Sequence, residues 1–383
     1  MEPECGDRMT VHAYRIYQYR LPLRRRLRVG GQNLSHREGL LLCLEDVEGR
    51  QGWGEAAPLP GFSSESLAGA REALLRAAEA VLGREVIRAD GDERPGASLP
   101  SVGFAVEQAL SELWAAEQGR SPARYWSASP APVLHLAALQ TAEERDDPER
   151  WAALAHGGYR AVKIKVGRGD PQEEADLVRR LAETAGLALR LDANRAWDLP
   201  TALAFAGRLE DVPIAYLEEP LARPEDLPAF LERTALPVAL DETLQALSPD
   251  DLERYRGVRA VVLKPTLLGG GHVLRRWVEA ARAAGSQPVF SAAFEAGVGM
   301  RGLVALASAL GDPDLPAGLD TYRALAADVL APRLPVERPV VDVEALLEQP
   351  VHLVEDRLTL LAAGTHDGYD SASRRRNGGV SGA

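Results

Sequence analysis

Short hydrophobic runs alternate with stretches of helical periodicity from residue 131 onward. Each run has the length and the β-branched content of a strand, and each is followed by a longer amphipathic segment. This alternation is typical of βα units that build a parallel sheet. The predicted strands read VLHLAALQ, AVKIKVG, LALRLDAN, IAYLEEP, PVALDET, AVVLKPT, PVFSAAFE and PAGLDTY. Eight strands close an α/β (β/α)8 barrel, which we predict for residues 131–330. An open doubly wound sheet is the alternative, but no GxGxxG follows the first strand.

The first 130 residues follow a different pattern, in which strand-like and helical segments are not paired as βα units. Residues 51–67 are rich in Gly and Pro and are predicted to be a loop. The other expected elements are strands over 11–21 and 38–49 and helices over 66–82 and 101–119, the last ending at Gly119. We therefore predict an α+β domain over residues 1–130.

Beyond residue 330 the βα pattern stops. Residues 331–364 contain strand-like pieces without further βα units, and we expect them to return to the N-terminal domain. Residues 365–383 are small, polar and rich in Gly and Ser, which predicts a disordered tail.

Six of the predicted strands carry a polar residue close to the carboxyl end, at intervals of 23 to 27 residues. A βα unit has about this length, so these side chains should stand at one level around the end of a barrel, where active sites of this architecture lie. The six residues are Lys165, Asp192, Glu218, Asp241, Lys264 and Ser291.

Asp192, Glu218 and Asp241 fall on three consecutive strands and so should be neighbours. One such carboxylate alone would more simply cap the helix that follows it. Three in one confined site would repel one another and raise each other's pKa, unless a cation lies between them. All-oxygen ligation suits Mg²⁺, and no histidine falls among these positions, which argues against zinc.

Lys163 and Lys165 alternate with apolar residues, so both should leave their strand on the same side. Lys264 should lie across the barrel mouth from them. The simpler interpretation is that these lysines form ion pairs with the carboxylates. A partly desolvated lysine near other cations is also able to act as a base, and a base beside a metal can remove a proton α to a carboxylate.

Composition restricts the partners. The chain of 383 residues has 46% hydrophobic and 26% charged residues and a net charge of −12, as expected for a globular protein but not for one that binds nucleic acid or an anionic membrane. Its two cysteines show no pairing pattern, and its first residues contain no apolar segment of a signal peptide, so we predict a cytoplasmic protein. Nothing in the sequence defines an oligomeric state.

The motifs resemble those of the enolase superfamily and, within it, the muconate lactonizing enzyme subgroup. Lysines on the second and sixth strands with Asp, Glu and Asp between them are the pattern of that subgroup. The likeness is greatest to the o-succinylbenzoate synthase family and extends over roughly residues 10 to 330. The segments that carry it are WGEAAPLPGFS (53–63), LRLDANRAW (189–197), YLEEP (216–220), LDETL (240–244), VVLKPTLLGG (261–270) and GLDT (318–321).

The resemblance implies a barrel capped by the α+β domain, with Asp192, Glu218 and Asp241 as Mg²⁺ ligands. Lys165 would be the base, Lys163 would ease its loss of a proton, and Lys264 would hold the enediolate by its charge. The substrate would be a small carboxylate, and the implied reaction is the Mg²⁺-dependent syn dehydration of 2-succinyl-6-hydroxy-2,4-cyclohexadiene-1-carboxylate to o-succinylbenzoate, a step of menaquinone biosynthesis.

Three further residues are candidates for substrate binding. Arg190 shares a face with Asp192 and Asn194, and it could pair with a substrate carboxylate or brace the acidic cluster. Asn194 could contact the substrate or a water on the metal. Ser291 stands where the family has a serine-rich stretch, although the hydroxyls expected beside it are replaced by alanines here.

Other functions remain open to this residue set. An N-succinylamino acid racemase would use the same two lysines on opposite faces of a substrate. A dipeptide epimerase is less compatible, because that family has Asp-x-Asp on the eighth strand, where this chain has Gly318 and Asp320. A barrel that serves only as a scaffold would be expected to lack one of the ligands or lysines, and all five are present.

Overall fold

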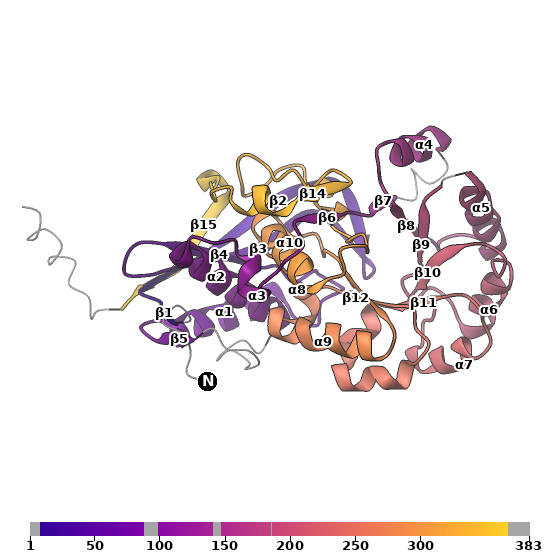
Figure 1. The fold of residues 1–383 in the computed structure, drawn as a ribbon, viewed down its shortest axis with the longest axis horizontal. Helices are drawn as coiled ribbons and strands as arrows, with labels where there is room; N and C mark the ends of the chain where they lie inside the picture. Colours follow the sequence, from indigo (N-terminus) through magenta and orange to yellow (C-terminus); the bar gives the residue numbers. More distant parts are fainter. Residues whose placement is uncertain (1–7, 88–98, 141–146, 185, 367–383) are drawn as a thin grey trace, which may run out of the picture.

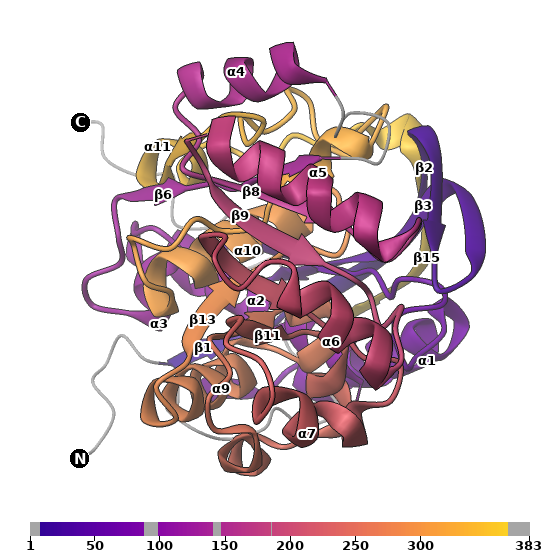
Figure 2. The same cartoon turned by 90° about the vertical axis from the view of Figure 1, so that its right-hand side faces the viewer.

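The computed structural model describes residues 8–87, 99–140, 147–184 and 186–366. Its largest sheet is parallel and curls around an axis, with helices on its outer side (Figures 1 and 2). The strands lie in sequence order: β7 (Ala138–Gln140), β8 (Ala161–Lys165), β9 (Ala188–Asp192), β10 (Ile214–Glu218), β11 (Val238–Leu240), β12 (Ala260–Leu263) and β13 (Gln287–Phe290). This arrangement is an α/β fold of the TIM-barrel type, as predicted.

The eighth predicted strand is shorter than expected. PAGLDTY forms only two isolated parallel bridges, Ala317 to Leu136 and Gly318 to Ser291, and these connect the two ends of the sheet. A Cβ at Gly318 would lie 2.7 Å from Ser291 Oγ, so a side chain there would require the Ser291 hydroxyl to shift. The first predicted strand is also divided, because β6 (Val133–His135) pairs antiparallel with β14 (Val340–Asp342) before β7 enters the parallel sheet.

Helices cover the outer face of this sheet, and several begin at the residues expected of helix N-termini. Asp147 and Asp198 accept hydrogen bonds from backbone amides of the first turns of α4 and α6, and each is followed closely by a proline. The helices of this half are α4 (Pro148–His156), α5 (Pro171–Thr184), α6 (Leu199–Gly207), α7 (Leu227–Leu231), α8 (Pro265–Leu268), α9 (Gly271–Ala283) and α10 (Gly297–Leu310), and α3 (Ala123–Trp126) precedes them.

A small apolar cluster fills the inside of the curled sheet. It comprises Tyr216, Ala239, Ala260, Val262 and Val289. All of these except Ala260 precede a predicted site residue by two positions along the chain. Because side chains alternate along a strand, residues two apart lie on the same side, one above the other. Glu218, Asp241, Lys264 and Ser291 therefore lie directly above an apolar floor. Beneath Lys165 and Asp192 the corresponding residues are Lys163 and Arg190.

The N-terminal part contains a separate antiparallel sheet in the order β15-β2-β3-β4 (Figure 1). Its elements are β2 (Ala13–Val29), β3 (Gln32–Glu45), β4 (Gln51–Ala56) and β15 (Leu358–Thr365), with helices α1 (Leu67–Val81) and α2 (Pro100–Gln118). Two short strands, β1 (Arg8–Thr10) and β5 (Glu85–Ile87), form a second ribbon beside it. Both predicted helices are present, within two residues of their expected ends.

The prediction that residues 51–67 form only a loop was wrong, because β4 occupies the first part of this segment. The glycines that suggested a loop are required by packing. A Cβ at Gly54 would lie 1.8 Å from the carbonyl oxygen of Ala105 in α2, and one at Gly52 would lie 2.0 Å from that of Ala109. The helix lies so close to the strand that only glycine fits between them.

The hairpin of β2 and β3 is longer than the sequence pattern indicated, and its tip reaches the barrel mouth. Gly30 has a φ of +52°, and a Cβ there would lie 1.9 Å from the carbonyl oxygen of Gly61. The tip therefore packs directly against the loop that follows β4. These two segments carry the N-terminal contribution to the site.

Residues after 330 contact both parts of the molecule. β14 pairs with β6, α11 (Val343–Leu347) follows, and β15 pairs with β2 along most of its length. The division into domains at residues 130 and 330 stays a prediction. The predicted tail lies almost entirely outside the described residues. Within the described ranges, no helix is long and apolar enough to cross a membrane.

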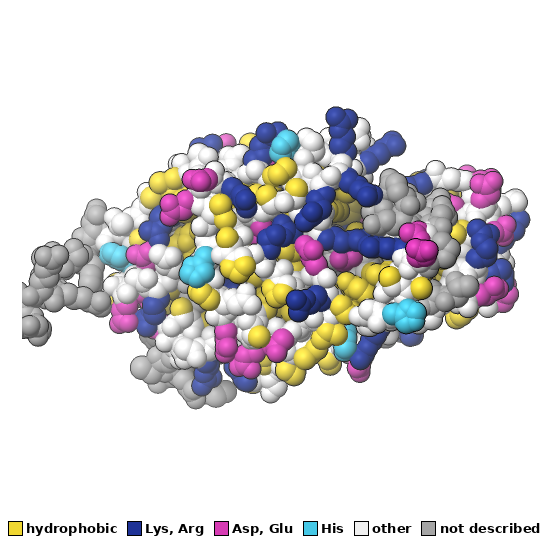
Figure 3. All heavy atoms as spheres, turned by 90° about the horizontal axis from the view of Figure 1, so that it is seen from above, with side chains coloured by type: hydrophobic (Ala, Val, Ile, Leu, Met, Phe, Trp, Pro, Cys, Tyr) yellow, Lys and Arg dark blue, Asp and Glu magenta, His cyan; other side chains and the backbone are white. Residues whose placement is uncertain are grey.

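The surface carries charges of both signs. Lys and Arg side chains are intermixed with Asp and Glu over the face shown in Figure 3, so the net charge of −12 is not spread as a uniform acidic surface.

Candidate active site

The strand ends bring the six predicted polar residues to one level. Lys165, Asp192 and Glu218 are the last residues of their strands and are direct neighbours in the register of β8, β9 and β10. The other three each follow the last residue of β11, β12 or β13, and they are Asp241, Lys264 and Ser291.

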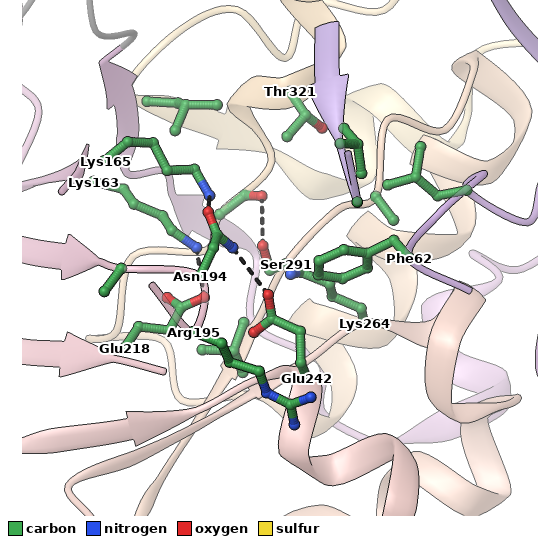
Figure 4. Close-up of a pocket in the computed structure, with 18 of the residues that line it drawn as sticks. Phe62, Lys163, Lys165, Asn194, Arg195, Glu218, Glu242, Lys264, Ser291 and Thr321 are labelled. Atoms are coloured by element: carbon green, nitrogen blue, oxygen red, sulfur yellow. Dashed lines mark hydrogen bonds and ion pairs between the residues drawn. The ribbon is translucent and has the colours of Figure 1, made fainter. Parts of the chain in front are cut away.

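A cavity of about 990 Å³ opens above this level. The barrel contributes its floor and walls, and the N-terminal part contributes the hairpin tip around Gly30 and the loop with Phe62. In Figure 4, Lys163 and Lys165 enter from one side, and Lys264 lies on the other side with Phe62. The candidate site thus lies between the two parts of the chain.

Lys163 lies between two carboxylates. Its Nζ is 2.7 Å from Asp192 Oδ2 and 2.7 Å from Glu218 Oε1. Burial by itself would lower the pKa of Lys163, but the charges of Asp192 and Glu218 outweigh it and hold the pKa well above its ordinary value. This lysine therefore stays protonated and offsets the charge of the acidic cluster.

Lys165 is the more open of the two lysines on β8. Its Nζ donates to Asp192 Oδ2 and to Asn194 Oδ1, each at 2.6 Å, and 23% of its side chain is exposed. Burial alone would raise the pKa of Asp192, but Lys163 and Lys165 outweigh it and hold that pKa below its usual range. Asp192 is therefore a carboxylate that both lysines share.

Lys264 has a more enclosed environment. It forms an ion pair with Asp241, only 9% of its side chain is exposed, and its Nζ lies 4.8 Å from the centre of the Phe62 ring. Burial opposes its charge, but Asp241 outweighs burial and raises the pKa of Lys264. The lysine is thus held in the charged form.

The three carboxylates are all buried, with exposed fractions of 0%, 0% and 3% for Asp192, Glu218 and Asp241. Among the described residues Glu218 Oε2 has no hydrogen-bond partner, and burial together with Asp192 raises the pKa of Glu218 well above its ordinary value. Lysine ammonium groups lie among the other oxygens, and in the described part of the chain no three acidic, His or Cys side chains converge as a ready-made cation site. The oxygen-only donor set and the unpartnered Glu218 oxygen nevertheless fit a hard divalent cation.

The chain has well-defined relatives among known proteins. A family model described as "Enolase C-terminal domain-like" matches residues 147–350, which include every candidate site residue, and "MenC, N-terminal domain" matches residues 11–113. The o-succinylbenzoate synthase of Klebsiella pneumoniae (strain 342) is 35% identical over 336 residues, which is 86% of this chain and 97% of that protein. This chain belongs to the o-succinylbenzoate synthase family of the enolase superfamily. A second member, from Salmonella newport, is 36% identical over 326 residues, 84% of this chain and 94% of that protein.

Solved structures place the fold of this family member in a wider group. The L-Ala-D/L-Glu epimerase from Bacillus subtilis has a TM-score of 0.76 at 20% identity and covers 93% of this chain and 100% of its own. The N-succinyl Arg/Lys racemase from Bacillus cereus has a TM-score of 0.78 at 18% identity, with coverage of 92% and 100%. At these identities the likeness concerns the fold.

Two of the predicted substrate-binding residues make hydrogen bonds within the protein, and their roles toward a substrate stay predictions. Arg190 donates to the carbonyl oxygen of Pro316 at 2.7 Å and lies 5.4 Å from the centre of the Tyr216 ring, while still lining the cavity. Ser291 Oγ donates to the carbonyl oxygen of Gly318 at 3.2 Å. Arg190 therefore ties β9 to Pro316, which directly precedes the two bridges made by Ala317 and Gly318.

Glu219 supports the site from behind. It accepts hydrogen bonds from the backbone amides of Asp241 and Thr243, both at 2.8 Å, and it pairs with Arg195. Its backbone has a φ of +43°, in the left-handed region. Glu219 thus fixes the loop that carries Asp241.

Arg37 is a supporting residue that the sequence pattern did not reveal. It is 1% exposed and donates to the carbonyl oxygens of Phe294, Pro58 and Ala57. It therefore connects β3 with the loop after β4 and the loop after β13, and both loops border the cavity. Nothing in its local sequence distinguishes it from the exposed arginines of the same hairpin.

Proposed function

We propose that this protein catalyses the syn dehydration of 2-succinyl-6-hydroxy-2,4-cyclohexadiene-1-carboxylate to o-succinylbenzoate, as a hydro-lyase of menaquinone biosynthesis. Membership of the family supports this proposal. The observation that carries it is the placement of Lys165, Asp192 and Glu218 side by side at the ends of adjacent strands, with Lys264 across the cavity.

Asp192, Glu218 and Asp241 are the residues that would hold Mg²⁺. They are buried, they offer only oxygen, and one oxygen of Glu218 has no partner. When bound, the cation would stabilise the negative charge that develops on the substrate carboxylate as the α-proton leaves.

Lys165 is the group placed to move the proton. In its neutral form, Nζ takes the proton from the carbon α to the carboxylate, and the electron pair passes into an enediolate. The same Nζ then returns that proton to the departing hydroxyl on the same face, so the C–O bond breaks and water leaves. One lysine suffices for both transfers because the proton and the hydroxyl leave from the same face of the ring. The loss of water makes the product ring aromatic.

Lys264 is placed to act by its charge. The ion pair with Asp241 and the adjacent Phe62 ring keep its ammonium group beside the cavity. From there it stabilises the developing dianion without exchanging a proton. Lys163 supports the same charge balance from beneath Lys165.

An N-succinylamino acid racemase is the second candidate, because lysines stand on both sides of the cavity (Figure 4). A dipeptide epimerase is disfavoured by Gly318. Gly318 stands where such enzymes carry an aspartate, and a Cβ there would lie 2.7 Å from Ser291 Oγ, so this hydroxyl would have to shift.

We also propose that the N-terminal part and β15 act as a cap on the barrel, with the Gly30 hairpin tip and the Phe62 loop closing the cavity mouth. A small carboxylate is the expected partner, and a cytoplasmic location stays a prediction.

The test is a side-by-side assay of the purified protein with Mg²⁺ on the cyclohexadiene substrate and on N-succinylamino acids. We expect dehydration, its loss on chelation of the metal, and its loss in Lys165→Ala without loss of the folded circular dichroism spectrum. Racemisation without dehydration would overturn the proposal in favour of the second candidate.

A further inference from the structure

Glu242 is a cavity residue that the proposed reaction does not use. It directly follows Asp241 and begins the short 3₁₀ helix Glu242–Ala246, and its side chain turns into the cavity. Its Oε1 accepts a hydrogen bond of 2.9 Å from Asn194 Nδ2, as Figure 4 shows. Its Oε2 is buried without a hydrogen-bond partner.

Asn194 joins Glu242 to the proposed base. Its Oδ1 accepts from Lys165 Nζ at 2.6 Å, while its backbone amide donates to Asp192 Oδ1 at 3.0 Å. Its backbone has a φ of +45°, a conformation that asparagine tolerates better than most residues. The backbone contact therefore holds the residue in place, and only the side-chain amide remains to be oriented.

The two neighbours determine that orientation. A lysine ammonium group can only donate hydrogen bonds, and a carboxylate can only accept them. An asparagine amide has one accepting and one donating end, so a single orientation satisfies both Lys165 and Glu242. Without the carboxylate, Lys165 would be the only one of these two neighbours to orient the amide.

The acceptor on Asn194 matters because Lys165 shares its other acceptor. Asp192 Oδ2 lies 2.6 Å from Lys165 Nζ and also 2.7 Å from Lys163 Nζ. Without Asn194 Oδ1, Lys165 would have only this shared oxygen. Asn194 therefore holds the Lys165 ammonium group apart from that of Lys163, at the more open side of the cavity.

We propose that Glu242 is a positioning residue for Lys165, acting through the side-chain amide of Asn194. This inference rests on the proposed function, in which Lys165 transfers the proton. Glu242 then fixes where Nζ stands relative to the substrate α-carbon, while binding of the substrate depends on other groups. Its removal should lower kcat more than it raises KM.

A double-mutant cycle tests this route. Glu242→Leu and Asn194→Leu should each lower kcat by about 10- to 100-fold, the usual effect of losing a hydrogen bond to a charged group. The double variant should be no slower than Asn194→Leu, because Glu242 has no effect once its intermediary is gone. If kcat of the double variant fell by the product of the two single losses, the inference would be overturned.

Conservative variants separate this role from general effects. Glu242→Gln keeps an oxygen that accepts from Asn194 Nδ2, so it should regain most of the activity that Glu242→Leu loses. Asp250 is an exposed carboxylate eight residues further along the chain. Asp250→Ala therefore serves as the control for the loss of a negative charge near the site. With α-deuterated substrate, Glu242→Leu should show a larger isotope effect on kcat than wild type, a readout that reduced folding alone would not change.

Two measurements do not require turnover. Calorimetry should give nearly the same Mg²⁺ affinity for Glu242→Leu and wild type, and a large decrease would mean that Glu242 acts on the metal instead. A crystal structure of Glu242→Leu should show the contact between Lys165 Nζ and Asn194 Oδ1 lost, and its retention at 2.6 Å would overturn the inference. Active wild type with an equally active Glu242→Leu variant would refute the inference alone, whereas inactive wild type would refute the proposed function.

Discussion

The two sides of the cavity present lysines in contrasting environments. Lys165 is 23% exposed, shares Asp192 with Lys163 and has a neutral acceptor in Asn194. Lys264 is 9% exposed and is enclosed between Asp241 and the Phe62 ring. The first lysine is therefore the more accessible from the cavity, whereas burial and a carboxylate partner enclose the second.

This difference indicates that the two lysines have different roles, which the sequence motifs alone do not reveal. A racemase of the two-base type needs both lysines to lose and gain protons. A syn elimination needs one lysine to do so, while the other remains charged. The asymmetry of the cavity favours the elimination.

The largest expected effect comes from replacing each lysine with arginine. Arginine keeps the positive charge but does not lose its proton at accessible pH. Lys165→Arg should therefore lower kcat for dehydration by at least about 10³-fold, within the range for loss of a general base. Lys264→Arg should retain much more activity, because only its charge is required. Steady-state kinetics on both variants checks this, and equal losses would remove the proposed asymmetry.

A second difference should appear in stability. Lys264→Met leaves the carboxylate of Asp241 buried without its partner, which typically costs about 3–5 kcal/mol of unfolding free energy. Lys165→Met should cost much less, because Lys163 still pairs with Asp192. Urea unfolding of the metal-free proteins measures both values.

The pH dependence of this stability has a defined sign. The pKa of Lys264 is raised in the folded protein, so the folded state holds its proton more tightly than the unfolded chain does. The advantage of wild type over Lys264→Met should be complete below the ordinary lysine pKa and should decline as the pH rises through the raised value. An advantage that grows with alkaline pH would contradict the ion pair.

The smallest expected effect concerns Phe62, which the N-terminal part contributes. Phe62→Leu keeps an apolar side chain but removes the aromatic ring over Lys264, an interaction that contributes about 0.5–2 kcal/mol. If the full interaction acts on the transition state, activity should fall by about 2- to 30-fold. Leu59→Ile, on the same loop, provides a control that keeps the volume and removes no ring. If both substitutions had the same effect, the ring would have no specific role.

The sequence predicted the barrel and the level of the six polar residues because both follow from periodicity. A strand has only two faces, so alternation predicts which side chains of the strands ending in Lys165 and Asp192 face the cavity. The length of the βα units predicts that these strand ends lie at the same level of the barrel. Contacts between residues that are far apart in the sequence have no such pattern. Arg37, the strand β4 and the bridges at Gly318 depend on which distant backbone lies close by.

The role of Asn194 was only partly predictable for the same reason. Its distance of two residues from Asp192 placed it near the proposed metal ligands, and the sequence suggested substrate or a water on the metal as its partners. Its contacts with Lys165 and Glu242 depend on its φ of +45° and on the turn after β11. Neither feature has a signal in the residue types.

A crystal structure of the protein grown with Mn²⁺ in place of Mg²⁺ tests the central claim most directly. Anomalous scattering would show the metal without reference to activity. We expect one peak that contacts oxygen atoms of Asp192, Glu218 and Asp241, with Lys165 and Lys264 on opposite sides of it. A peak elsewhere, or none while the lysines keep their ion pairs with these carboxylates, would contradict the account.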